Sequence, residues 1–234
     1  MKLTAIISIA VTLILGYLYP ISTLLTRACT ILGATVAFVL ILLISWPRKS
    51  LRYALIGGAL LLSSFVVAPG RAFSIPQLRA ANTHELFVYD GTRYIWGGEN
   101  RIGIDCSGLI RRALINASLE QSVMTANPRL VRFALSLWWH DCTARDLGLG
   151  VRGLTSPVTS ERSINALDAS KLEPGDLAVT SNGVHILAYA GGNTWVEADP
   201  NLGRVTVVRV PDKSNGWFNV PVNIARWQIF RAGS

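Results

Sequence analysis

The stretch Tyr94-Ile-Trp-Gly-Gly-Glu-Asn-Arg-Ile-Gly-Ile-Asp-Cys-Ser-Gly-Leu-Ile-Arg-Arg112 sets one cysteine at the start of a predicted helix. Glycines before the cysteine predict a turn-rich loop, and Asp105 is a favourable N-cap for a helix over residues 106–115. Because the positive end of the helix dipole stabilises a thiolate, we expect the pKa of Cys106 to lie below its ordinary value of about 8.5. This position suits a catalytic nucleophile. The alternative is a small buried structural residue, since free cysteine is among the most buried residue types.

Two linked boxes in this stretch resemble the signature of the NlpC-type cell-wall endopeptidases, which are papain-like cysteine peptidases. Residues 94–98 form a Tyr-x-Trp-Gly-Gly element, and residues 105–108 form an Asp-Cys-Ser-Gly box. Two intact boxes at this spacing are far more specific than a lone cysteine. The resemblance covers approximately residues 80–232. It implies an α+β fold in which the nucleophile helix packs on an antiparallel sheet of about five strands, and it implies neither a cofactor nor a metal.

The N-terminal third of the chain is apolar, and all of its charges are positive. The chain of 234 residues is 50% hydrophobic and only 15% charged, which is too apolar for an ordinary soluble domain. Seven of the 22 Lys and Arg residues, and none of the 14 Asp and Glu residues, come before Glu85. The remainder is therefore nearly neutral. The net charge of +8 reflects the flanks of membrane segments rather than binding to nucleic acid.

Three apolar runs are each long enough to cross a bilayer as a helix. We expect transmembrane helices at approximately residues 3–19, 27–46 and 52–69. The first run has the alternative of being a cleaved signal peptide, but no clear small-residue cleavage site follows it. The loop between the second and third spans holds three basic residues, which the positive-inside rule places in the cytoplasm. We therefore expect a multi-pass protein of the bacterial inner membrane, with a cytoplasmic N-terminus and a periplasmic or extracellular catalytic domain.

The sequence divides into a membrane region at residues 1–70, a tether at 71–83 that leads into a short helix, and a catalytic domain at 84–234. After the nucleophile helix, residues 116–173 are predicted to be mostly helix and loop, with the strongest helix at 128–146. This region is longer than is usual in the family that the chain resembles. We interpret the excess as an insertion that shapes the substrate groove.

Short strands separated by turn signals follow from residue 172 onward. The predicted strands cover residues 177–180, 184–190, 194–198, 203–210 and 225–231. Helices followed by a meander of antiparallel strands form an α+β layout.

A cysteine nucleophile needs a base within hydrogen-bond reach and a third group that orients the base. Of the three histidines, His84 lies next to the tether and His140 lies inside a predicted helix. His185 lies on a predicted strand, where the resembling family places its base. The family takes its third polar residue from the neighbouring strand, and the matching position here is Glu197, with Asp199 as the nearby alternative.

The resemblance also implies residues that contact the substrate. The backbone N–H of Cys106 would hold the oxyanion, with the hydroxyl of Tyr94 as the side-chain candidate. Asp105 is a candidate for binding a substrate amine, although a role as helix cap explains it equally well. Ser107 and Asp199 are further substrate or oxyanion candidates.

The three cysteines, Cys29, Cys106 and Cys142, show no metal-ligand spacing and no disulfide framework. A bridge between Cys106 and Cys142 is formally possible, but it would block the proposed nucleophile.

The sequence thus predicts a membrane-anchored extracytoplasmic cysteine peptidase, or thiol protease, that cuts amide bonds in peptidoglycan stem peptides through a thioester at Cys106. Its expected partners are the peptide stems, the lipid bilayer and a membrane protein, because three spans exceed what anchoring requires. Two alternatives stay open. One is an amidase, transpeptidase or acyltransferase that uses the same Cys–His pair, and the other is a catalytically silent scaffold that binds the wall.

Overall fold

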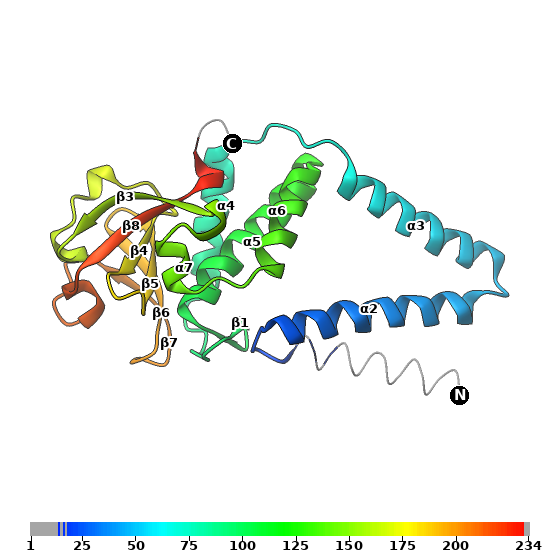
Figure 1. The fold of residues 1–234 in the computed structure, drawn as a ribbon, viewed down its shortest axis with the longest axis horizontal. Helices are drawn as coiled ribbons and strands as arrows, with labels where there is room; N and C mark the ends of the chain where they lie inside the picture. The colour runs from blue at the N-terminus through cyan, green and yellow to red at the C-terminus, as the bar shows by residue number, and fades with distance from the viewer. Residues whose placement is uncertain (1–13, 15, 17, 232–234) are drawn as a thin grey trace.

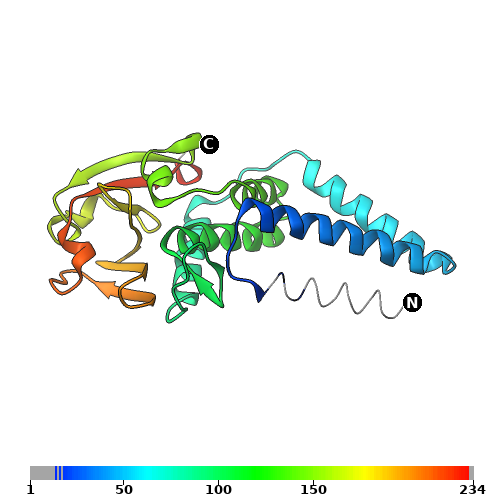
Figure 2. The same cartoon turned by 60° about the horizontal axis from the view of Figure 1, so that its bottom comes forward.

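Two long apolar helices, α2 (Leu24–Ser45) and α3 (Lys49–Val67), form a hairpin that projects away from the rest of the chain (Figures 1 and 2). The structure is a computed structural model that describes residues 14, 16 and 18–231. Both helices are long and apolar enough to cross a membrane, and they correspond to the second and third predicted spans. The first predicted span, at residues 3–19, lies almost entirely outside the described residues. The described residues thus hold two candidate spans, and the predicted number of three is not confirmed.

Four further helices are each preceded by a polar residue whose side chain accepts a hydrogen bond from the first turn. These helices are α4 (Ile75–Val88), α5 (Cys106–Thr125), α6 (Pro128–Trp139) and α7 (Ala144–Gly148). Their N-caps are Ser74, Asp105, Asn127 and Thr143. The helices α4, α5 and α6 pack together as one layer (Figure 1).

A six-stranded antiparallel sheet forms the second layer, in the order β3-β8-β4-β5-β6-β7. Its strands are β3 (Thr155–Glu161), β4 (Leu177–Thr180), β5 (Ile186–Gly191), β6 (Thr194–Asp199), β7 (Arg204–Arg209) and β8 (Val222–Trp227). A separate two-stranded hairpin, β1 (Glu99–Asn100) and β2 (Gly103–Ile104), precedes α5. Short 3₁₀ turns cover residues 151–153, 164–166, 169–171, 216–219 and 228–230.

Both faces of the large sheet are buried, so the domain has two cores. The larger core lies between the sheet and the helical layer and includes Leu78 of α4 and Leu109 of α5. The smaller core lies on the other face, where Trp195 and Phe218 pack under the loops that carry the 3₁₀ turns. This layering confirms the α+β class and the antiparallel sheet predicted from the sequence.

Residues 75–83, which the sequence analysis assigned to a tether, form the first part of α4 in the structure. Leu78 has no exposed surface, and Ala81 and Asn82 are also buried. Arg79 donates a hydrogen bond to the carbonyl of Phe230, near the end of the described chain. Helix α4 is therefore part of the folded domain. Residues 68–74 alone connect it to α3.

Two local predictions were wrong. The helix predicted at residues 128–146 ends at Trp139, because His140 is extended and Thr143 starts a new helix with Asp146 in a capping box. The region 116–173 also contains the edge strand β3, which the sequence analysis missed. Its sequence is polar and contains Pro157, which lies at an irregularity in the pairing with β8, where proline is tolerated.

Candidate active site

Asp105 connects the Tyr-x-Trp-Gly-Gly element at residues 94–98 to the Asp-Cys-Ser-Gly box at residues 105–108. One carboxylate oxygen of Asp105 accepts the backbone N–H of Gly108 at 2.6 Å and thereby caps α5. The other oxygen accepts the backbone N–H of Gly97 at 2.8 Å. A Cβ atom at Gly108 would collide with the carbonyl of Gly98, so the glycine allows the two boxes to touch. This contact holds Cys106 at the first position of α5.

Cys106 lines a pocket of about 370 Å³. Three other predicted site residues, Tyr94, Asp105 and Ser107, line the same pocket. Ser107 donates a hydrogen bond to Asp105 at 3.1 Å, and the loop that follows α6 supplies the facing wall with residues 141–144. The structure therefore brings these four residues together, and part of the predicted insertion borders them.

Burial raises the pKa of the Cys106 thiol to about 12, and the charge of Asp105 adds to this effect. Backbone hydrogen bonds from Ile186, Ser107 and Cys106 itself lower the pKa, but they do not offset the burial. The expectation of a lowered pKa at the helix N-terminus was therefore wrong. The dipole and the backbone donors are present, but desolvation outweighs them, so the thiol is protonated at neutral pH.

His185 lies immediately before β5, beside the Ile186 amide that points at the thiol. The Nε2 atom of His185 lies 2.6 Å from Oε2 of Glu197 on β6, and both side chains are fully buried. The β5–β6 hairpin that turns at residues 191–193 brings the two together. Within the described residues, the thiol makes no hydrogen bond to the histidine ring. Contacts of this kind often tighten only when a substrate binds. Because Glu197 occupies Nε2, Nδ1 is the nitrogen of His185 that stays available.

The sequence analysis missed two residues, Asn215 and Trp217, that hold this pair from the other side. Asn215 donates to Oε1 of Glu197 at 2.5 Å, and the indole of Trp217 stacks on the ring of His185 with centroids 4.3 Å apart. Both residues belong to the turn at residues 215–219, which lies between β7 and β8. No sequence motif pointed to that turn.

Asp199 and Tyr94 have different surroundings from those of Glu197. Asp199 accepts the indole N–H of Trp217 at 3.3 Å and the backbone N–H of Asn201 at 2.7 Å, and Trp217 in turn stacks on His185. Burial, together with the charges of Cys106, Asp105 and Asp199, raises the pKa of the Tyr94 hydroxyl. Tyr94 therefore stays neutral and can donate a hydrogen bond into the pocket.

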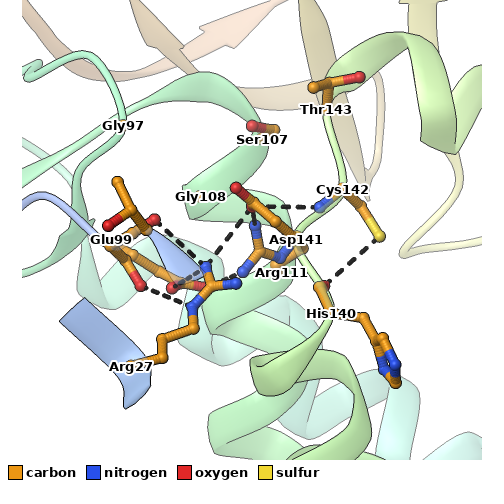
Figure 3. Close-up of polar contacts among 12 residues, drawn as sticks. Arg27, Gly97, Glu99, Ser107, Gly108, Arg111, His140, Asp141, Cys142 and Thr143 are labelled. Atoms are coloured by element: carbon orange, nitrogen blue, oxygen red, sulfur yellow. Dashed lines mark hydrogen bonds and ion pairs between the residues drawn. The ribbon is translucent and has the colours of Figure 1, made fainter. Parts of the chain in front are cut away.

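One wall of the pocket carries a group of charges that the sequence analysis did not foresee (Figure 3), three of them buried and one, Asp141, exposed. Glu99 pairs with Arg27 at 3.1 Å and with Arg111 at 2.6 Å, and Asp141 contacts both arginines. We refer to Arg27, Glu99, Arg111 and Asp141 as the charge cluster. In the sequence, Arg27 lies beside an apolar run and Arg111 lies within the helix predicted after Asp105. In the structure both are 2% exposed.

The described residues contain no group of three or more His, Cys, Asp or Glu side chains that could hold a metal ion. All three cysteines are free.

The fold and this pocket define a class of α+β domains in which a cysteine starts a helix that packs against an antiparallel sheet. The chain matches the NlpC/P60 family over residues 91–219, more than half of its length, and it belongs to that family. The match includes Cys106, His185 and Glu197 but excludes α2, α3 and α4. No curated protein matches the chain.

Several solved structures are similar to the chain. NlpC1 from Trichomonas vaginalis is 18% identical, with a TM-score of 0.43, and the match covers 68% of this chain and 46% of that protein. The peptidoglycan hydrolase RipB from Mycobacterium tuberculosis is 21% identical, with a TM-score of 0.42, and 70% of each chain is covered. An NlpC/P60 family protein from Bacillus cereus is 18% identical, with a TM-score of 0.40, and the match covers 68% of this chain and 41% of that one. The chain thus spans less than half the length of the Trichomonas and Bacillus proteins.

The raised pKa of Cys106 predicts how its alkylation depends on pH. In a Cys29→Ser, Cys142→Ser background, the rate of reaction with iodoacetamide should keep rising from about pH 7 to about pH 10, because the reactive thiolate is the minor species throughout. The rate is measured by mass spectrometry of samples quenched at timed intervals. The same protein unfolded in urea is the control and should titrate with the ordinary pKa of about 8.5. If the alkylation rate of the folded protein levels off below about pH 8.5, the thiolate is already formed at rest. That result would contradict the raised pKa of Cys106.

Proposed function

We propose that the protein is a membrane-anchored extracytoplasmic cysteine peptidase that hydrolyses amide bonds in peptidoglycan stem peptides through a thioester at Cys106. NlpC/P60 proteins are in general cysteine peptidases that act on peptidoglycan, and this chain belongs to that family. The observation that carries the proposal is the arrangement around the pocket. Cys106 faces the start of β5, where His185 is held at 2.6 Å by the buried carboxylate of Glu197.

In the proposed acylation step, Cys106 and His185 act together. The thiol is neutral at rest, so His185 takes its proton through Nδ1 as the sulfur attacks the amide carbonyl. The carboxylate of Glu197 stabilises the imidazolium that results and fixes the orientation of the ring. The imidazolium then gives its proton to the leaving amine, the C–N bond breaks, and a thioester remains on Cys106.

Deacylation uses the same groups in the reverse order. Nδ1 of His185 takes a proton from water, the resulting hydroxide adds to the thioester, and the C–S bond breaks. The product is a free carboxyl group, and the thiol regains its proton. In both steps the backbone N–H of Cys106 and the neutral hydroxyl of Tyr94 are the proposed donors to the oxyanion. We propose that Asp105 and Ser107 shape the substrate groove, since both line the pocket. Asp199 is proposed to hold Trp217 in place beside His185.

Exposed apolar surface on the helical hairpin supports membrane anchoring. A core helix of a soluble protein would be mostly buried, but α3 has no buried residue, and three consecutive leucines, Leu60–Leu62, are all largely exposed. The basic residues Arg48, Lys49 and Arg52 lie at the tip of the hairpin, the end farthest from the catalytic domain (Figure 1). This placement supports the proposed topology, with the tip in the cytoplasm and the domain outside.

The proposed activity predicts specific products from purified muropeptides. The full-length protein in detergent should convert them into fragments separated by one hydrolysed amide bond, which mass spectrometry detects as a gain of one water. Cys106→Ala should lose this activity, because it removes the proposed nucleophile. An acyl transfer to an amine would instead give a product without added water. Identical profiles from the wild type and Cys106→Ala would contradict the enzymatic function and favour a scaffold.

A second prediction distinguishes Glu197 from Asp199. Glu197→Gln removes the charge that faces His185, and we expect kcat/KM for muropeptide hydrolysis to fall by roughly 10²- to 10⁴-fold. The matched control is Asp199→Asn, which keeps an acceptor for the indole of Trp217 and should cost less than about tenfold. If the two losses are reversed, Asp199 rather than Glu197 is the orienting carboxylate.

A further inference from the structure

The chain between the two N-terminal apolar segments is built into the wall of the pocket. The backbone N–H of Glu99 donates to the carbonyl of Pro20 at 2.9 Å, and that of Ser22 donates to the carbonyl of Gly97 at 2.8 Å. The side chain of Asn100 donates to the carbonyl of Tyr19 at 3.2 Å. Residues 19–22 therefore pair with the edge of the segment that carries the Trp-Gly-Gly element, and Ser22 lines the same pocket as Cys106.

The first turn of α2 is fixed to the pocket by the charge cluster. Arg27 lies in that turn, yet its guanidinium reaches back into the domain, where it pairs with Glu99 and contacts Asp141 (Figure 3). It also donates to the hydroxyl of Ser22 at 2.9 Å. An arginine at the end of an apolar helix commonly extends its charged group toward the interface. The first turn of α2, which would lie at the membrane interface, therefore also forms part of the pocket wall.

The other end of the helical hairpin is also attached to the domain. The guanidinium of Arg132 on α6 donates to the carbonyls of Val66 and Ala68 at the end of α3, at 2.6 and 2.7 Å. Asn127 and Arg71 exchange two hydrogen bonds a few residues later. With both ends of the hairpin attached, the domain has a fixed height and orientation relative to the bilayer that the hairpin would cross.

The rim of the pocket suits the membrane–water interface. Trp96 and Val184 line the pocket and are 78% and 57% exposed. Tyr19, in the paired segment, is 54% exposed, and Ile102 at the tip of the β1–β2 hairpin is also exposed. Tryptophan and tyrosine are enriched at membrane interfaces, where one side of the ring is apolar and the other is wet. The exposed apolar groups therefore gather where the pocket meets the start of a candidate membrane helix.

We propose that the pocket is built to receive peptides attached to a lipid and presented at the membrane surface, rather than peptides in the distant wall or in solution. This inference rests on the proposed function, since it assumes that the hairpin spans the membrane and that Cys106 hydrolyses the amide. It narrows the substrate class to a stem peptide whose scissile amide lies close to its lipid anchor. The chemistry is the hydrolysis given above, with water as the second reactant.

The test uses the full-length protein in lipid vesicles and three synthetic probes with the same stem peptide. One probe is free, one is joined to a diacyl lipid by a short spacer, and one is joined by a polar spacer about 40 Å long when extended. The two lipid-linked probes are used at the same surface density. Because effective concentration falls with linker length, the short-spacer probe should be cleaved about tenfold faster than the long-spacer probe. The free probe should be cleaved more slowly than either one.

The other outcomes separate a failure of this inference from a failure of the proposed function. If the short and long spacers give equal rates, or the long spacer is faster, the pocket does not work at the membrane surface and the inference is overturned while the hydrolase stands. If the free probe is cleaved as fast as the short-spacer probe, the inference is overturned in the same way. If no probe is cleaved above the level of Cys106→Ala, both the inference and the proposed function fail.

Discussion

Glu99 is the residue that joins the start of the helical hairpin to the α+β domain. It is 2% exposed, and each of its carboxylate oxygens binds one buried arginine, Arg27 from α2 and Arg111 from α5. Removing one partner of a buried ion pair typically costs about 3–5 kcal/mol, because a charge is left without compensation. The Trp-Gly-Gly element, the start of α5 and the start of α2 are therefore held in one arrangement. Residues of all three segments line the pocket.

Burial of the site also determines the protonation state of its thiol. The thiol of Cys106 lies in a desolvated position next to Asp105, which raises its pKa to about 12 and keeps it protonated at rest. In the proposed reaction, the thiolate is therefore generated during the attack itself, with His185 as the base. The pair formed by His185 and Glu197 is prepared for this task, since the carboxylate is buried against the ring and further held by Asn215. At neutral pH a resting thiol of this kind reacts only slowly with small electrophiles, because little of it is thiolate.

Local patterns in the sequence predicted that Cys106 starts a helix and that His185 and Glu197 lie side by side. The two boxes specify Cys106, and a turn at residues 191–193 is enough to place Glu197 opposite His185. The parts that escaped prediction depend on contacts between distant segments. Arg27 looks like any charge beside an apolar run, and only the folded chain shows its partner 72 residues away.

The secondary-structure predictions failed where pairing or capping, rather than local periodicity, determines the element. The strand β3 is polar and contains proline, so it lacks the alternation that marks other strands, and its pairing with β8 alone makes it a strand. The helix at residues 128–139 ends where capping by Thr143 begins a new one, which the apolar periodicity did not indicate. The stacking of Trp217 on His185 likewise joins two loops that no motif connects.

The central claim is that Cys106 forms a covalent bond to the peptide during catalysis. It is tested most directly by quenching the reaction of the full-length protein with muropeptides in acid and mapping the modified peptide by mass spectrometry. The account predicts an acyl adduct on the peptide that contains Cys106, removed by hydroxylamine and absent from Cys106→Ala. Hydrolysis products that accumulate without any adduct on Cys106, and that Cys106→Ala also forms, would contradict it.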